Sequence, residues 1–142
     1  MADSVRSLTD ALERLDAILT GEPFGFRETE EPFGFDRQPS QGLDRSYCLL
    51  PGRARVGGLI GMQQAEVVPV TIRIARLVRR DANGAVRAVL TDCNSLCAAI
   101  SRDGVFGDYN ADVQPGEVRE PGPSDEHVVG ELMAVVDYER PL

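Results

Sequence analysis

The chain has 142 residues, about the length of one domain, and its 23 acidic and 15 basic side chains give a formal net charge of −8. All 15 basic residues are arginine, which excludes Schiff-base enzymes and the lysine of nucleotide-binding P-loops. The single histidine, His127, excludes metal motifs built on paired histidines, and the negative charge argues against tight binding of nucleic acid. No run of 18 apolar residues and no apolar segment near Met1 exists, so we expect neither a membrane span nor a secretory signal.

Residues 1–20 have the pattern of an amphipathic helix. Apolar residues from Val5 to Leu19 follow one another at three- or four-residue steps, which places them on one stripe. We expect Asp3 or Ser4 to cap the first turn and Gly21 to adopt a left-handed conformation after the last turn.

Residues 21–45 contain the sequence Pro-Phe-Gly-Phe twice, at residues 23–26 and 32–35. Four of the five phenylalanines of the protein lie in these two copies. We expect an extended loop whose phenylalanines pack on the body of the protein, and we favour packing within the same subunit over packing on a neighbour.

Strand patterns follow the loop. Residues 46–50 predict a short strand, stopped by Pro51 and Gly52. Residues 53–62 are rich in glycine, arginine and apolar side chains, which suits either an ordinary surface loop or a hairpin that becomes ordered on a partner. In residues 66–75 apolar and other residues alternate, which predicts a strand with one buried face. Because Pro69 has no N–H to donate, we expect this part of the strand at a sheet edge or a strand start.

Residues 81–84 carry a hairpin-turn signal, but apolar residues from Val86 to Ile100 lie on one helical stripe. The longer pattern predicts a helix over residues 83–101. Cys93 and Cys97 are one turn apart on this stripe, and we expect core thiols rather than metal ligands.

Residues 103–127 are acidic and rich in glycine and proline, so we expect an irregular loop. The spacing of Asp108, Asn110 and Asp112 imitates the start of a calcium loop. Val113 and Arg119 stand where such a loop needs glycine and a bidentate glutamate, so we expect no calcium site. Residues 128–139 predict a final strand that is apolar on both sides, which suggests that its second face is also covered.

These elements predict an α+β fold, in which a small mixed or antiparallel sheet of about four strands packs against two helices, with a long N-terminal loop and a Gly-rich hairpin. We expect residues 1–142 to form a single domain. Its parts would be the helix at 1–20, the loop at 21–45 and an α+β body at 46–142.

Charge is unevenly distributed along the chain. Residues 103–142 hold ten carboxylates and two arginines, whereas residues 1–102 are neutral and residues 53–87 hold seven arginines against Glu66 and Asp81. This pattern fits an ordinary solvated surface. It also fits a contact in which the positive segment of one copy faces the negative segment of the next, a heterologous arrangement that can close into a ring.

No set of residues predicts catalysis. Ser124, Asp125, Glu126 and His127 are neighbours in sequence, but sequence neighbours rarely converge, and no Gly-x-Ser-x-Gly turn is present. We expect His127 to be exposed. We also expect the protein not to be an enzyme and to have no catalytic, cofactor-binding or metal-binding residues.

Three segments carry a family resemblance: the opening helix through Leu19, Val-Thr-Ile-Arg-Ile at residues 70–74 before an alanine-rich helix, and Glu-Leu-Met-Ala-Val-Val-Asp-Tyr-Glu-Arg at residues 131–140. Together with the order of elements along the whole chain, they make the sequence similar to the tail terminator (tail completion) proteins of long-tailed bacteriophages. The repeated Pro-Phe-Gly-Phe is a departure from that pattern.

The resemblance implies an α+β subunit of a six-membered ring at the head-proximal end of the tail tube. The ring would stop tube polymerisation and provide the surface for head–tail joining. Its partners would be further copies of itself, the tail tube protein and a head-closure or connector protein. Genomic DNA would pass through the channel without specific binding. Such a protein needs no cofactor or membrane, is made in the host cytoplasm and resides in the virion.

From the charge pattern and the two-sided final strand we expect seven residues to contact neighbouring subunits or partners: Arg53, Arg55, Leu59, Ile60, Arg73, Met133 and Val135. Three alternatives remain open. The nearest is another phage neck protein, a head-closure protein or connector adaptor. The others are a small acidic binding module and a hydrolase.

Overall fold

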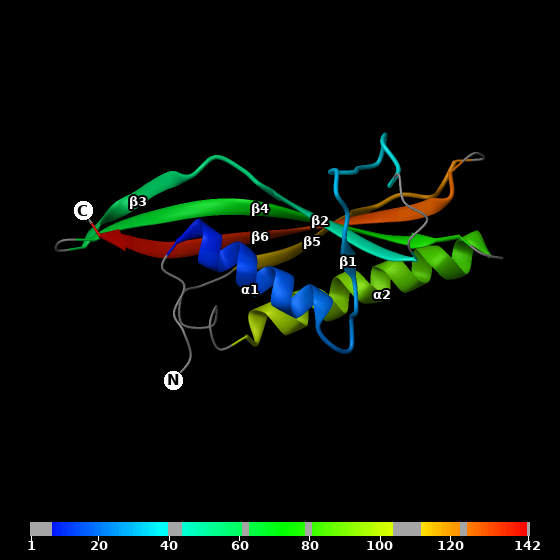
Figure 1. The fold of residues 1–142 in the computed structure, drawn as a ribbon, viewed down its shortest axis with the longest axis horizontal. Helices are drawn as coiled ribbons and strands as arrows, with labels where there is room; N and C mark the ends of the chain where they lie inside the picture. Colours follow the sequence, from blue (N-terminus) through cyan, green and yellow to red (C-terminus); the bar gives the residue numbers. More distant parts are fainter. Residues whose placement is uncertain are drawn as a thin grey trace.

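The computed structural model describes residues 7–39, 44–60, 63–78, 81–103, 112–122 and 125–141. These residues form an α+β fold with two helices and one mixed sheet of six strands (Figure 1). The elements are α1 (Leu8–Thr20), β1 (Arg27–Glu28), β2 (Arg45–Pro51), β3 (Arg55–Ile60), β4 (Gln63–Leu77), α2 (Ala82–Ser101), β5 (Asp112–Val118) and β6 (His127–Pro141). The expected fold class is confirmed, but the expected count of about four strands is wrong, because β1 and β5 are additional.

The long strands β4 and β6 form the centre of the sheet. The spatial order is β1-β2-β4-β6-β5, and β3 pairs with β4 beyond the end of β2. β1 runs parallel to β2, and every other pair is antiparallel. The strands expected at 66–75 and 128–139 are therefore present, and each extends to 15 residues. A strand of that length spans about 50 Å.

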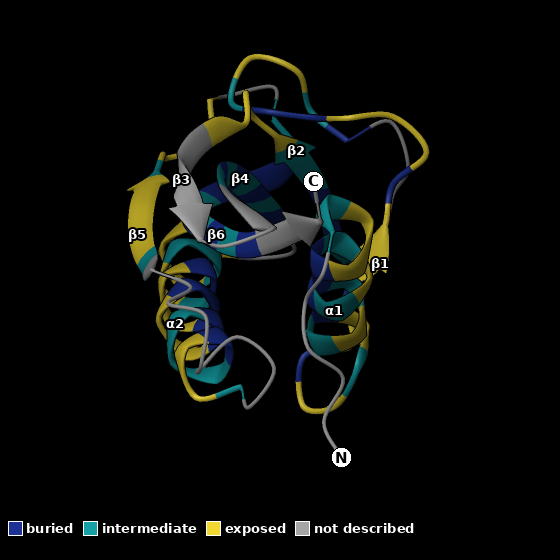
Figure 2. Ribbon diagram, turned by 90° about the vertical axis from the view of Figure 1, so that its left-hand side faces the viewer, coloured by how far each residue is buried: buried dark blue, intermediate teal, exposed yellow. Residues whose placement is uncertain are grey.

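Both helices lie on the same side of the sheet (Figure 2). They cover the even-numbered side chains of β4 and β6, among which Val70, Ile72 and Leu132 are completely buried. The helices contribute fully or almost fully buried side chains to the same core: Ala11, Leu15 and Leu19 from α1, and Val89, Cys93, Leu96 and Ile100 from α2. Cys93 is buried and Cys97 is partly buried against this core, as expected.

The ends of α1 differ from expectation. The helix begins at Leu8, and the Ser7 hydroxyl accepts a hydrogen bond from the Asp10 amide at 3.1 Å, so the cap is Ser7 rather than Asp3 or Ser4. Gly21 has φ −77° and ψ 167°, which is an extended conformation and not the left-handed one. The chain therefore leaves the helix as an extended segment and turns at Gly25, which has φ 63°.

Pro69 lies in the middle of β4, so the expected edge or strand-start position is wrong. β2 and β3 lie in succession along one side of β4, and the chain crosses from one to the other at residues 52–54. The Pro69 carbonyl accepts from the Gly52 amide at 2.7 Å, which shows that the backbone polar groups of Pro69 point to this side. Pro69 therefore lacks its N–H at the place where the partner strand is interrupted, and no ladder hydrogen bond is lost there.

Residues 103–127 are not wholly irregular, because they contain β5. This strand pairs with β6 from Asp112 to Val118, and a bulge between Pro115 and Val118, which includes Gly116, interrupts the ladder. A Cβ on Gly116 would lie 2.6 Å from the Glu131 carbonyl oxygen, so the bulge requires glycine. The residues of the calcium-like spacing before Asp112 lie outside the described part of the chain.

Candidate subunit interface

The phenylalanines of the two Pro-Phe-Gly-Phe copies pack on opposite faces of the sheet. Phe24 and Phe26 of the first copy are buried in the core on the helix side. Phe33 of the second copy is buried on the other side, where it packs with Cys48, and Phe35 is half-buried beside it. The expected packing within the same subunit is confirmed for these side chains. We call residues 29–39, which carry the second copy across the sheet, the Phe33 strap.

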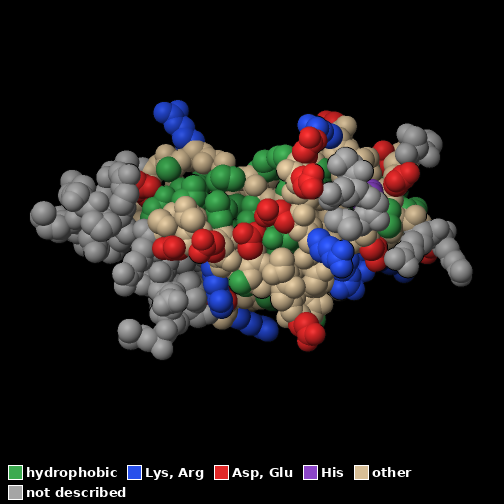
Figure 3. All heavy atoms as spheres, in the orientation of Figure 1, with side chains coloured by type: hydrophobic (Ala, Val, Ile, Leu, Met, Phe, Trp, Pro, Cys, Tyr) green, Lys and Arg blue, Asp and Glu red, His purple; other side chains and the backbone are tan. Residues whose placement is uncertain are grey.

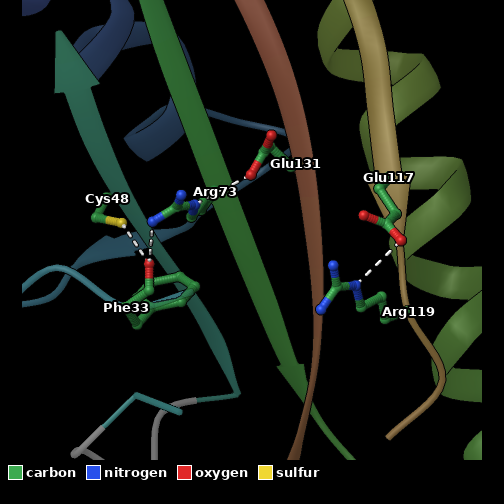
Figure 4. Close-up of polar contacts among 6 residues, drawn as sticks. All are labelled: Phe33, Cys48, Arg73, Glu117, Arg119 and Glu131. Atoms are coloured by element: carbon green, nitrogen blue, oxygen red, sulfur yellow. Dashed lines mark hydrogen bonds and ion pairs between the residues drawn. The ribbon is translucent and has the colours of Figure 1, made fainter. Parts of the chain in front are cut away.

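Arg73 fastens this strap to the sheet. Its Nη1 donates to the Phe33 carbonyl at 3.0 Å, and its Nε donates to Glu131 Oε2 on β6 at 3.2 Å (Figure 4). The Phe33 carbonyl also lies 3.7 Å from Cys48 Sγ on β2. Arg73 was expected to contact a partner, but its hydrogen bonds hold its own chain together.

The rest of this sheet face is not covered by the Phe33 strap. Pro69 pairs with Val135, and Thr71 pairs with Met133, so these four side chains point the same way on neighbouring strands. Val67 follows on the same face, where it pairs with the partly exposed carboxylate of Asp137. Met133 is 42% exposed and the other four are partly exposed. Figure 3 shows hydrophobic side chains gathered along β4 in the half of the molecule that contains β3. We call Val67, Pro69, Thr71, Met133 and Val135 the open patch.

Two exposed arginines border the open patch. Arg55 pairs with Val67 and therefore lies on the same face, and Arg53 precedes it in the crossing from β2 to β3. Within the described residues neither arginine has an ion pair or a side-chain hydrogen bond. Leu59 and Ile60 lie further along β3, opposite Gln64 and Gln63, and their side chains are outside the described part. We call Arg53 and Arg55 the arginine segment.

Acidic side chains gather at the other end of the sheet. Glu117, Glu120 and Glu126 are exposed there, at the end of β5 and the start of β6, and we call these three the acidic end. Glu117 Oε1 accepts from Arg119 Nε at 3.0 Å, and the Arg119 guanidinium lies 4.4 Å from the centre of the Phe35 ring (Figure 4 shows the ion pair). Arg119 thus links the acidic end to the Phe33 strap.

His127 is 2% exposed, so the expectation of an exposed histidine is wrong. Its backbone amide donates to Gln38 Oε1 at 2.9 Å, which places it under the end of the Phe33 strap. A substrate cannot reach a side chain buried to this extent in this conformation. Burial also raises the pKa of the Cys93 thiol to about 12 and that of Cys48 above its usual value, which keeps both thiols protonated at neutral pH.

One polar cluster has no counterpart in the sequence analysis. The Tyr47 hydroxyl on β2 donates to Asp16 Oδ1 on α1 at 2.7 Å, and burial, followed by the hydrogen bond to Asp16, raises the pKa of Tyr47. Glu28 on β1, although exposed, lies beside Asp16, and partial loss of hydration together with the Asp16 charge raises the pKa of Glu28. Residues 16, 28 and 47 are too far apart in sequence for a pattern to associate them. The cluster joins α1 to the edge of the sheet.

Among the described residues, no helix is long and apolar enough to cross a membrane, and no group of three or more His, Cys, Asp or Glu side chains is placed to hold a metal ion. Of the residues expected to contact a neighbour, Arg55, Met133 and Val135 lie on one face of the sheet, Arg53 lies at their border, and Arg73 holds the strap. The sequence matches no known protein-family model, and no curated protein matches it significantly.

Proposed function

We propose that this chain is a structural subunit of a long-tailed bacteriophage, a tail terminator that forms a closed, six-membered ring at the head-proximal end of the tail tube. The ring stops polymerisation of the tube protein and then offers its other side to the head-closure or connector protein. It works by binding and needs no catalytic group. The protein is made in the host cytoplasm and becomes part of the virion.

The observation that carries the proposal is the half-covered sheet face. The Phe33 strap covers one half, whereas the open patch exposes apolar side chains between two regions of opposite charge. A contiguous apolar surface on a small acidic chain is typical of a protein that binds another protein. The α+β class and the order of the elements also agree with the family resemblance of the sequence.

Capping follows from a subunit with two different surfaces. One side of the ring would resemble the next ring of tube protein and bind the tube end, and the other side would differ, so that no further tube subunit adds. The surplus of negative charge in residues 103–142 suits a ring through which DNA passes, since a negative wall repels the phosphate backbone.

A binding experiment separates a terminator from the nearest alternative, another neck protein. The purified chain is mixed with the tail tube protein and, separately, with the connector proteins encoded by the same phage genome. A terminator is retained by assembled tubes and caps one end of each tube in electron micrographs. Retention by the connector alone would instead identify a head-closure or adaptor protein and contradict the proposal.

A further inference from the structure

We propose that the open patch and the arginine segment of one subunit bind the acidic end of a second copy of this chain, in a head-to-tail contact. This inference rests on the proposed ring and names the two surfaces that build it. The acidic end of the first copy is left free for a third copy, so the contact propagates and can close.

The open patch supplies the apolar part of the contact. Its five residues come from adjacent strands, so their side chains form one continuous surface instead of scattered exposed groups. Met133 lies in it, 42% exposed, directly across from Thr71. On the second copy, the half-buried Phe35 ring lies beside the acidic end and provides apolar area to cover this surface.

Charge complementarity identifies a second copy of this chain as the molecule that binds the open patch. The arginine segment carries two positive charges with no ion pair among the described residues. The acidic end carries three carboxylates, and Arg119 is the basic residue that the structure places against them. A surface of unpaired arginines and a surface of surplus carboxylates on the same chain are complementary between copies.

The two charged regions cannot satisfy each other within one subunit. Arg55 lies beside Val67. Glu117 lies beside Glu131, which pairs with Arg73, and Glu126 precedes His127, which pairs with Leu77. The six residues of β4 from Val67 to Arg73 span about 20 Å, and the ten residues from Val67 to Leu77 span about 33 Å. Both spans are more than twice the Debye length of about 8 Å at physiological ionic strength. Only a second copy can bring an acidic end to the arginine segment.

Charge exchange tests the contact directly. In the Arg53→Glu/Arg55→Glu variant both surfaces are negative, and in the Glu117→Arg/Glu120→Arg variant both are positive. We expect each variant alone to associate about a hundredfold more weakly than the unaltered chain, as measured by native mass spectrometry and light scattering, because like charges then face each other. Mixed in equal amounts, the two variants should assemble again, with alternating copies and assemblies larger than a dimer.

The matched controls lie away from the contact. Arg27→Glu/Arg87→Glu makes the same change in net charge at exposed positions on β1 and α2 and should leave assembly intact. Met133→Arg should weaken assembly in every combination, whereas Leu90→Arg, at a residue 46% exposed on α2, should not. Circular dichroism establishes that each variant is folded.

The inference is overturned if charge reversal leaves association unchanged, or if the unaltered chain stays monomeric at every concentration. It is also overturned if the mixed variants do not assemble, or if they assemble no further than a dimer. The inference and the proposed function fail separately. If the swapped variants assemble only together but the protein caps no tube, the contact stands and the function falls. If the protein caps tubes but the substitutions are harmless, the function stands and this contact falls.

Discussion

At the scale of single residues, arginine side chains join neighbouring elements through hydrogen bonds to carboxylates. Arg76 on β4 makes two hydrogen bonds with Asp92 on α2, at 2.5 and 2.9 Å. Arg14 on α1 makes a similar bidentate contact with Asp103, just after α2. Arg14 and Asp103 are 89 positions apart, so the sequence shows which charges exist but not how they pair.

Loss of Asp92 is expected to destabilise the fold. Its side chain is 12% exposed, and its removal leaves the Arg76 guanidinium largely buried without its carboxylate. We expect Asp92→Ala to lower the free energy of unfolding by about 3 kcal/mol, measured by urea denaturation. Glu31→Ala is the control, because the Glu31–Arg37 pair is mostly exposed and its loss should cost less than about 0.5 kcal/mol. Equal losses for the two variants would contradict this assignment.

Glu28 predicts a pH dependence of stability. Its raised pKa means that the folded protein holds the proton more tightly than the unfolded chain does, so the contribution of Glu28 is present at low pH and is lost as pH rises through the folded pKa. Glu28→Gln keeps a neutral donor beside Asp16. We expect the melting temperature of this variant to exceed that of the unaltered protein by an amount that grows as pH rises above 4.5.

Glu13→Gln, on the exposed side of α1, controls for the loss of one surface charge. A difference between the Glu28 variant and the unaltered protein that stays constant with pH, or that shrinks as pH rises, would exclude the coupling between Glu28 and Asp16.

At the scale of elements, strong hydrophobic periodicity was sufficient to predict a helix or strand from the sequence, and weak periodicity was not. β4, β6 and α2 could be predicted because their buried residues repeat every second residue or at helical steps. β5 reads Asp-Val-Gln-Pro-Gly-Glu-Val, in which only Val113 and Val118 are apolar residues that pack against the core. Its extended state comes from pairing with β6, a tertiary effect that local sequence does not encode. The cap at Ser7 was missed because Val5 continues the apolar stripe upstream of the helix.

Gly130 sets how closely α2 approaches β6. A Cβ there would lie 2.5 Å from Val89 Cγ1 and 3.1 Å from Cys93 Sγ, both on buried side chains. We expect Gly130→Ala to destabilise the protein by about 2 kcal/mol through overpacking, measured by thermal denaturation. Adding Val89→Ala removes the nearest methyl group, so the double variant should lose less than the sum of the two single variants. Additive losses would show that the approach is not limited by this contact.

At the scale of the whole molecule, alternation along β6 placed Met133 and Val135 on the face opposite the core, which the structure bears out. The sequence also suggested that this face is covered. It could not show that the protein covers half of it with its own Phe33 strap, because that depends on where a loop without periodicity returns to the sheet. For the same reason Arg73 was assigned to a partner, although it fastens the strap.

Only part of the charge segregation along the sequence is a separation in space: Arg73 pairs with Glu131 across β4 and β6, whereas the arginine segment and the acidic end lie at different ends of the sheet. One polypeptide thus carries two complementary surfaces that cannot meet within a subunit. Under the proposed function, assembly is a property of the copies together, and salt should weaken it by screening the charges.

Tail length in a phage that lacks this protein is the most direct measure of the proposed role. The gene is interrupted by a stop codon in a phage genome that encodes the chain, and particles from the suppressing and non-suppressing hosts are compared by electron microscopy. We predict tubes of variable and excessive length that are not joined to heads, with uniform length restored when the chain is supplied in trans. Tails of uniform, normal length in its absence would contradict the account.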